Sequence, residues 1–282
     1  MIGMQWLRRL LHRHKPQIPD ILWRDCIGRL PFLRTLSAGE LTRLKALSET
    51  LLATKTITGA GELEVTDEIA VLISAQACLL VLNLTLDLYN DMSGIIVYPS
   101  AFIVPHSEMD DAGVLHEWRE PLSGEAVQAG GAVVLSWEDV ETAHTAADGY
   151  NVVIHEFAHK IDMSRGNANG CPPFLATYHH DIEAWLWQQA FSAAYADFSL
   201  RVDLLDRQLP DDFDSDRPAD VAHYNALFAA LPMDPYAAKH PAEFFAVASE
   251  VFFIRPQPLA ADYPEIYRLL AQYYRQDTLA RA

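Results

Sequence analysis

Cysteine is scarce in this chain of 282 residues, which has only Cys26, Cys78 and Cys171, far apart in the sequence. So small and odd a number excludes a disulfide framework and a cysteine-based zinc site. Basic residues are also few, with 21 Lys and Arg against 38 Asp and Glu, and the formal net charge is −17. Such an acidic surface repels phosphate backbones and anionic membranes, so we expect no direct binding of nucleic acid.

Long apolar runs are missing as well. No stretch of about 18 uncharged apolar residues is present, so we expect no membrane span. A secretory signal needs an unbroken apolar run of roughly 7–15 residues, but at the N-terminus the bases Arg8, Arg9, Arg13 and Lys15 interrupt the apolar residues. We therefore expect a cytoplasmic protein. Residues 1–19 are predicted to form a basic N-terminal arm, either a solvated helix or a docking arm for an acidic partner.

Half of the residues are apolar, which is enough for a substantial buried core. Helical periodicity dominates, and short strand-like runs occur only near the middle of the chain. Helices are predicted at residues 20–55, 69–82, 179–208 and 241–253, and also in a stretch that starts near Tyr150 and in one after Pro264. Strands are predicted at 94–97, 101–104 and 132–137. A surface loop is predicted at 209–220. With no repeat and no break in composition, we predict an α+β fold. It consists of one mostly helical domain over residues 20–282 with a small central mixed sheet.

One pentapeptide, His155-Glu156-Phe157-Ala158-His159, has the H-E-x-x-H pattern of zinc metallopeptidases. Four residues make about one helical turn, so both imidazoles project from one helix face and can bind one Zn²⁺ ion. Glu156 stands beside them, where it can take a proton from a zinc-bound water. The flanking residues are apolar, and these polar side chains would be costly to bury without a compensating cation. We therefore predict a zincin-type active-site helix in a single catalytic domain.

A catalytic zinc ion takes a third protein ligand. Asp162 and Arg165 stand where the metzincin pattern requires glycine and histidine, so that class is excluded. The other common form takes a glutamate from a later helix, and the candidates are Glu183 and Glu243. Glu183 has polar neighbours, whereas Glu243 has apolar neighbours and needs a cation, so we favour Glu243. Glu250, seven residues further on, is either an acceptor for the N–H of a ligand histidine or an ordinary surface acid.

Several segments together resemble the Mlc titration factor A family of zinc peptidases, which is related in its catalytic part to the protease domain of anthrax lethal factor. The segments are residues 94–102, 133–137, 150–162, 234–238 and 241–247, and the resemblance covers about residues 20–275. It implies a Zn²⁺ ion bound by His155, His159 and Glu243, with Glu156 as catalytic base and Tyr236 reaching into the site. It also implies aminopeptidase-type activity. Enterobacterial members of the family bind the glucose repressor Mlc and relieve repression of the glucose phosphotransferase system.

The mechanism that follows is hydrolysis of a peptide or protein substrate by a zinc-activated water. Glu156 takes the water proton and delivers it to the leaving amine. The hydroxyl of Tyr236 is a candidate donor to the developing oxyanion, and the alternative is a core or turn tyrosine. The strand predicted at 132–136 is either the sheet edge to which a peptide adds or an interior strand. The rival hypothesis is a non-catalytic anti-repressor that binds an Mlc-like repressor and has a vestigial or structural zinc site.

Overall fold

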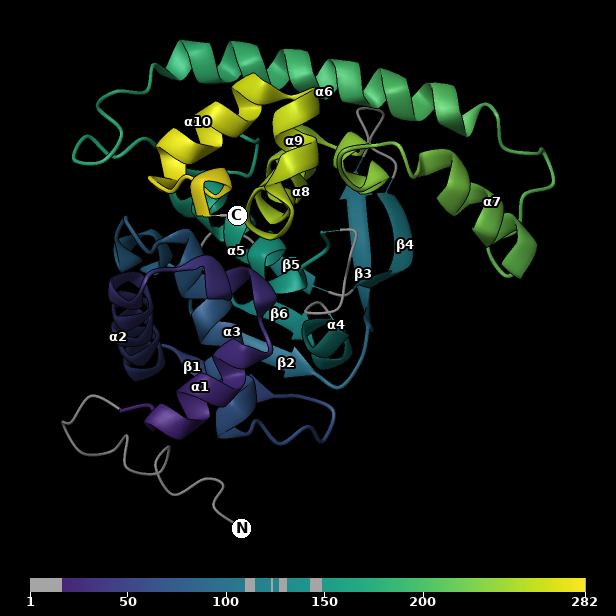
Figure 1. Ribbon diagram of the computed structural model, residues 1–282. Helices are drawn as coiled ribbons and strands as arrows, with labels where there is room; N and C mark the ends of the chain where they lie inside the picture. Colours follow the sequence, from purple (N-terminus) through teal and green to yellow (C-terminus); the bar gives the residue numbers. More distant parts are fainter. Residues whose placement is uncertain (1–16, 110–114, 123, 127–130, 143–148, 282) are drawn as a thin grey trace.

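The structure is a computed structural model that describes residues 17–109, 115–122, 124–126, 131–142 and 149–281. The predicted basic arm at 1–19 lies outside these ranges except for its last three residues. Helices surround a small sheet, with α1, α2 and α3 toward the bottom of Figure 1 and α6, α8, α9 and α10 toward the top. The predicted α+β class is confirmed.

A four-stranded mixed sheet in the middle of the chain has the order β1-β2-β6-β5. Strands β1 (Thr56–Gly59), β2 (Gly94–Tyr98) and β6 (Val133–Ser136) are parallel, and β5 (Gly124–Ala126) is antiparallel to β6. Strands β3 (Phe102–Met109) and β4 (Leu115–Leu122) form a separate antiparallel pair. The three predicted strands are present as β2, β3 and β6, whereas the sequence pattern does not predict β1, β4 or β5.

Strand β6 is an interior strand, because it pairs with β2 on one side and with β5 on the other. The suggestion that residues 132–136 form the edge of the sheet is therefore wrong. All four residues of β6 are buried, as expected for a strand that is covered on both faces. Within the described part of the chain, the edges of this sheet are β1 and β5.

Helix α3 (Asp67–Leu80) is the central helix of the N-terminal half, and its residues from Ile69 onward are all buried. Helices α1 (Asp20–Gly28), α2 (Ala38–Thr54) and α5 (Val152–Asp162) pack against it. Burial on every side explains its nearly continuous apolar sequence. At the start of α2 the capping box is present, because Ser37 Oγ accepts from the Glu40 N–H and the Glu40 carboxylate accepts from the Ser37 N–H.

The N-terminus of α5, the helix that carries the H-E-x-x-H pattern, is bound to α3 by a buried asparagine. Asn151 Oδ1 accepts a hydrogen bond from the Ile154 N–H at 2.9 Å, which caps α5. Asn151 Nδ2 donates to Gln76 Oε1 of α3 at 2.7 Å. Both side chains are fully buried. The asparagine therefore fixes the start of α5 against the core.

Asn151→Ala should lower the free energy of unfolding by about 2 kcal/mol, because it removes a helix cap and leaves a buried amide oxygen without its donor. Ser37→Ala is the matched control, since it also removes a helix cap but in an exposed setting, and it should lower the free energy by about 1 kcal/mol. Urea denaturation of the metal-free protein measures both. Equal losses would show that the bond to Gln76 contributes nothing.

The C-terminal half consists of helices, most of which begin with proline at their first turn. They are α6 (Ala184–Asp206), α7 (Pro218–Phe228), α8 (Pro241–Ile254), α9 (Pro256–Asp262) and α10 (Pro264–Tyr274). Short elements connect the larger ones: η2 (Pro31–Thr35), η3 (Leu86–Tyr89), α4 (Trp137–Thr142), η4 (Met163–Arg165) and η5 (Pro235–Ala238). A last short element, η6 (Leu279–Arg281), follows α10. Helix α8 is buried from Phe244 to Phe253 and packs against α5. These two helices position the candidate site.

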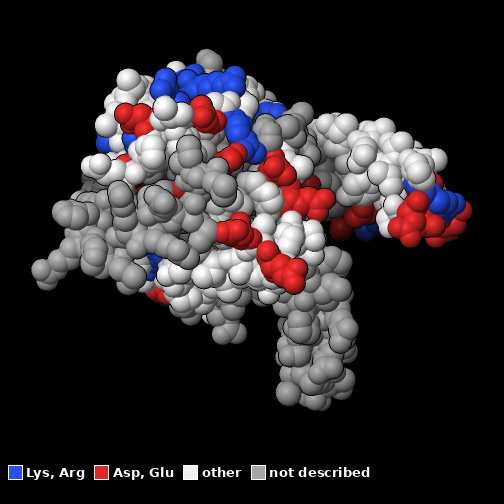
Figure 2. Space-filling view, turned by 90° about the horizontal axis from the view of Figure 1, so that it is seen from below, with Lys and Arg blue, Asp and Glu red and all other residues white. Residues whose placement is uncertain are grey.

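Helix α6 runs across the top of the molecule in Figure 1, and its C-terminal end together with α7 forms an arm that projects to the right. The predicted surface loop at 209–220 is shorter than expected, because α7 begins at Pro218. Arg217 Nε lies 2.9 Å from the Asp220 carboxylate and 3.6 Å from that of Asp214, and Figure 2 shows basic and acidic side chains gathered at the tip of the arm. Of the helices in the described ranges, none is long and apolar enough to cross a membrane.

Candidate metal centre

Helices α5 and α8 bring three potential metal ligands together. His155 and His159 project from α5, and Glu243 lies in the first turn of α8. Nε2 of His155, Nε2 of His159 and Oε2 of Glu243 are each 3.1 Å from the other two. Among the described residues this is the one group of three or more His, Cys, Asp or Glu side chains that could hold a metal ion.

The triangle has the dimensions of a zinc site. A tetrahedral Zn²⁺ ion with ligands at about 2.0–2.1 Å separates its ligand atoms by about 3.3 Å, close to the 3.1 Å found here. The side chains of His155, His159 and Glu243 are 12%, 10% and 19% exposed, so the triangle is reached from solvent on one side. Three protein atoms leave a fourth position for water or substrate, as in catalytic zinc sites.

The charges of the cluster suit a cation at its centre. Burial alone would raise the pKa of Glu243, but hydrogen bonds from His155 and His159 outweigh burial and lower it far below its usual range. Burial alone would lower the pKa of His155, but its bonds to Glu243 and Glu250 raise it well above the usual range. Both shifts favour positive charge beside carboxylate. A divalent ion supplies that charge and leaves the imidazoles neutral.

Glu250 is the predicted acceptor for a histidine N–H and not a surface acid. Its side chain is buried, and Oε1 lies 2.7 Å from Nδ1 of His155. Its other oxygen, Oε2, accepts the backbone N–H of Asn151 at 2.5 Å. A proton held on Nδ1 leaves the Nε2 lone pair of His155 free for a metal ion at the centre of the triangle, which is the tautomer that a metal ligand needs.

Glu250→Gln should weaken zinc binding by about 10–100-fold, because the amide orients the imidazole less strongly than a carboxylate does. Glu265→Gln, the same replacement in an exposed pair with Arg268, is the control and should bind zinc as the wild type does. Competition with a chelator of known affinity measures both. Equal zinc affinity in the two variants would contradict the orienting role of Glu250.

The structure also places the remaining predicted residues. Glu156 is buried next to the two histidines, and burial raises its pKa although both imidazoles oppose the shift. Tyr236 lies in η5, 39% exposed, with its ring centroid 6.0 Å from that of His155. It is therefore not a core residue. The alternative ligand Glu183 is exposed at the start of α6 and does not belong to the cluster.

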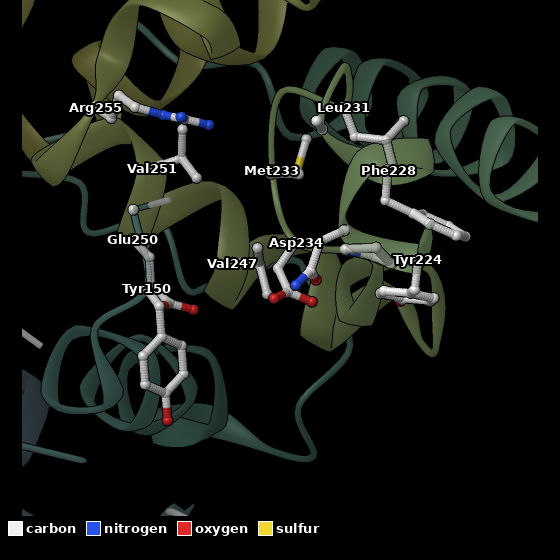
Figure 3. A pocket seen from close by; sticks show the side chains of 14 residues that line it. Tyr150, Tyr224, Phe228, Leu231, Met233, Asp234, Val247, Glu250, Val251 and Arg255 are labelled. Carbon is white, nitrogen blue, oxygen red and sulfur yellow. The ribbon is translucent and has the colours of Figure 1, made fainter. Parts of the chain in front are cut away.

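A cavity of about 390 Å³ adjoins the cluster and separates α8 from α7 and the segment before η5 (Figure 3). Val247 and Val251 of α8 face Leu231 and Met233 across it. Glu250 lies in its wall, so one side chain contacts both the cavity and His155. Cavities of this volume are typical of small-ligand sites.

Three features that support the cluster were not predicted from the sequence. Asn151 precedes an apolar run and carries the helix-start signal that could have identified it. Gln76 of α3 carries no such signal, because its contact with Asn151 joins segments far apart in the sequence. The loop at 169–171 carries none either, because its contacts with Asp162 are made by irregular backbone.

Comparison with known proteins places the chain among metallopeptidases. Residues 4–275 match the family model described as glucose-regulated metallo-peptidase M90. The chain belongs to this family. It is 33% identical over 283 residues to Mlc titration factor A of Pectobacterium atrosepticum, and the match covers 100% of this chain and 94% of that protein. It is 32% identical over 273 residues to an uncharacterized protein of Synechocystis, and that match covers 96% of this chain and 88% of the relative. The resemblance found in the sequence motifs is thus confirmed.

Proposed function

We propose that this protein is a zinc-dependent peptidase of the aminopeptidase type that acts on peptide or protein substrates in the cytoplasm. One domain over residues 20–282 would carry the activity, with residues 1–19 as a basic arm. The observation that carries the proposal is the triangle of donor atoms from His155, His159 and Glu243, 3.1 Å on each side and open to solvent. Membership of a metallo-peptidase family supports it.

In this proposal His155, His159 and Glu243 hold the Zn²⁺ ion, which when bound lowers the pKa of a water ligand toward ~7 and polarises the scissile carbonyl. With the ion bound, Glu156 would accept the proton of a water at the site and deliver it to the leaving amine. Burial raises the pKa of Glu156 above its usual range, which is the direction that favours a general base. Positioned proton transfer of this kind contributes about 10²–10⁴-fold to the rate.

Tyr236 is the candidate donor to the oxyanion. Asp234 accepts the backbone N–H of Tyr236 at 2.8 Å and fixes the start of η5. The Nζ atom of Lys239 lies 5.1 Å from the centroid of the tyrosine ring. A cation near the ring and partial exposure toward His155 suit a phenol that donates to developing negative charge.

Tyr236→Phe should lower kcat by about 100-fold and change KM little, because an oxyanion donor acts mainly in the transition state. Tyr195→Phe is the matched control. Tyr195 donates its hydroxyl proton to the Ala238 carbonyl at 3.1 Å and so contacts η5 without facing the cluster. Steady-state kinetics on one peptide substrate measures both variants. A kcat for Tyr236→Phe within twofold of the control value would remove the tyrosine from the mechanism.

We propose that the substrate binds along an edge of the sheet. Strand β5 is the edge nearest to the motif helix, since it packs against α5. An extended peptide that adds to this edge by backbone hydrogen bonds would pass beside the cluster. In this proposal β5, and not residues 132–136, is the sheet edge to which the peptide adds.

A panel of amino-acid p-nitroanilides and longer quenched peptides tests the proposed activity and its exopeptidase character. Zinc-loaded protein should release p-nitroaniline from free-amino substrates, lose the activity with a chelator and regain it with zinc. Cleavage of N-acetylated peptides at the same rate would contradict the aminopeptidase type. If protein that holds stoichiometric zinc hydrolyses none of these substrates, the proposed peptidase activity is wrong.

Relatives named Mlc titration factor A, which match nearly the whole chain, favour a second candidate function, binding of an Mlc-like repressor that controls sugar phosphotransferase genes. This role would be compatible with catalysis, or would replace it if the zinc site were vestigial. Binding of a purified repressor to Glu156→Gln separates the two. An inactive variant that still binds the repressor shows that binding does not require hydrolysis.

A further inference from the structure

Two polar atoms in the last turn of α5 are buried without a hydrogen-bond partner among the described residues. They are Nδ1 of His159 and Oδ1 of Asp162. The two residues are only 8% and 4% exposed, so bulk water does not solvate these atoms. A buried polar atom without a partner destabilises the folded protein. Two of them on neighbouring side chains point to a missing shared partner.

The two side chains lie on the same face of the helix. Asp162 follows His159 by three residues, and helical side chains lean toward the N-terminus, so the carboxyl group of Asp162 lies over the turn that carries His159. Burial raises the pKa of the Asp162 carboxyl group, whereas the loop N–H groups and the nearby His159 oppose that shift. The atoms are too far apart for a direct hydrogen bond but close enough for electrostatic interaction. Water is the small buried partner that commonly bridges two such atoms.

The other oxygen of Asp162 is firmly held. Oδ2 accepts backbone N–H groups from Asn169 at 2.8 Å and from Gly170 at 2.7 Å. Gly170 has a φ of +80°, and a Cβ there would lie 2.5 Å from the Pro241 carbonyl oxygen, so the loop touches the first turn of α8. The carboxylate is thus fixed between the helix of His159 and the helix of Glu243.

We infer that Asp162 positions His159 by accepting, through one buried water, the proton on its Nδ1. The Nε2 lone pair is then directed at the centre of the triangle with Glu243. Each imidazole thereby has its own carboxylate: Glu250 serves His155 directly, and Asp162 serves His159 through the water. The inference rests on the proposed function, because this tautomer is the one that a zinc ligand requires.

The competing explanation is that Asp162 only anchors the loop at 169–171. Asp162→Asn separates the two roles, since the amide keeps a carbonyl oxygen for the N–H groups of Asn169 and Gly170 but loses the anion that faces His159. Zinc affinity should fall by about tenfold, the low end of the range for groups that orient a ligand. The melting temperature of the metal-free variant should stay near that of the wild type.

Asp277→Asn is the control, because the carboxylate of Asp277 also accepts a backbone N–H, from Ala280 at 3.1 Å, and the net charge changes equally. Its zinc affinity should equal that of the wild type. If Asp162→Asn loses zinc affinity and the metal-free variant loses stability to the same extent, Asp162 only anchors the loop and the inference is overturned. Unchanged zinc affinity in Asp162→Asn would also overturn it. A wild type that binds no zinc would overturn the proposed function together with the inference.

A spectroscopic measurement on the wild type decides the matter even if the variant fails to fold. In zinc-loaded protein with ¹⁵N-labelled histidine, the Nδ1–H of His159 should give a protected resonance that exchanges magnetization with a long-lived water. Asp162→Asn should shift this resonance and leave that of His155 in place, whereas Glu250→Gln should do the reverse. Rapid exchange of the His159 ring proton with bulk solvent in the wild type would overturn the inference.

Discussion

Glu156→Gln is expected to bind zinc as tightly as the wild type and to hydrolyse peptides at least 10²–10⁴-fold more slowly, the contribution of a positioned acid–base group. Glutamine has nearly the same shape as glutamate, and Glu156 supplies none of the three donor atoms of the triangle. The glutamine amide, however, cannot accept the proton of the attacking water. Metal analysis and initial rates on one p-nitroanilide measure the two quantities separately.

Glu183→Gln is the matched control for this variant. Glu183 is an exposed acid at the start of α6 and the ligand candidate that the sequence left open. Its replacement should change neither zinc content nor rate. Hydrolysis by Glu156→Gln at the rate of this control would show that another group acts as the base, and the proposed mechanism would be wrong.

Glu243→Ala is expected to lose zinc and, with it, all chelator-sensitive hydrolysis. The replacement removes one corner of the triangle and leaves the Nε2 atoms of His155 and His159 facing each other at 3.1 Å without a carboxylate. The loss of zinc affinity should exceed the roughly 10–100-fold that replacing an orienting group such as Glu250 costs. The fold should persist, because Glu243 lies in the first turn of α8 and is partly exposed.

Chelator competition measures the zinc affinity of Glu243→Ala, and circular dichroism verifies its helices. Stoichiometric zinc at wild-type affinity in a folded Glu243→Ala variant would contradict the ligand assignment. Retained activity after removal of zinc from the wild type would contradict the metal mechanism as a whole.

The two helices that form the site are the best predicted part of the fold. The apolar run from Phe244 to Phe253 and Pro241 at its start indicated α8, and the H-E-x-x-H pattern fixed the face of α5, because these signals are local in sequence. The apolar neighbours of Glu243 favoured it over Glu183 as a ligand. The seven-residue spacing placed Glu250 on the same helix face, but its role stayed open between an acceptor and a surface acid. The roles of Gln76 and Asp162 could not be predicted, since each depends on contacts made only after folding.

Other parts of the fold were not predicted from the sequence or were left ambiguous. Strand β1 has only four residues, most of them exposed, so it shows neither length nor an apolar face. Helix α7 follows an acidic loop in which Pro218 resembles a loop residue as much as a helix start. The pattern of β6 was ambiguous, because four apolar or small residues suit an interior strand as well as an edge. Pairing with β5 decided it, and that pairing has no signal in the sequence.

X-ray absorption at the zinc edge on zinc-loaded protein tests the central claim most directly. The triangle of His155, His159 and Glu243 predicts two imidazole nitrogens at about 2.0–2.1 Å and carboxylate or water oxygens at about 2.0–2.2 Å, with no sulfur. Glu243→Ala, reconstituted at high zinc concentration, should keep the two imidazoles and lose the carboxylate. A sulfur shell near 2.3 Å, or three imidazoles, would contradict the site described here.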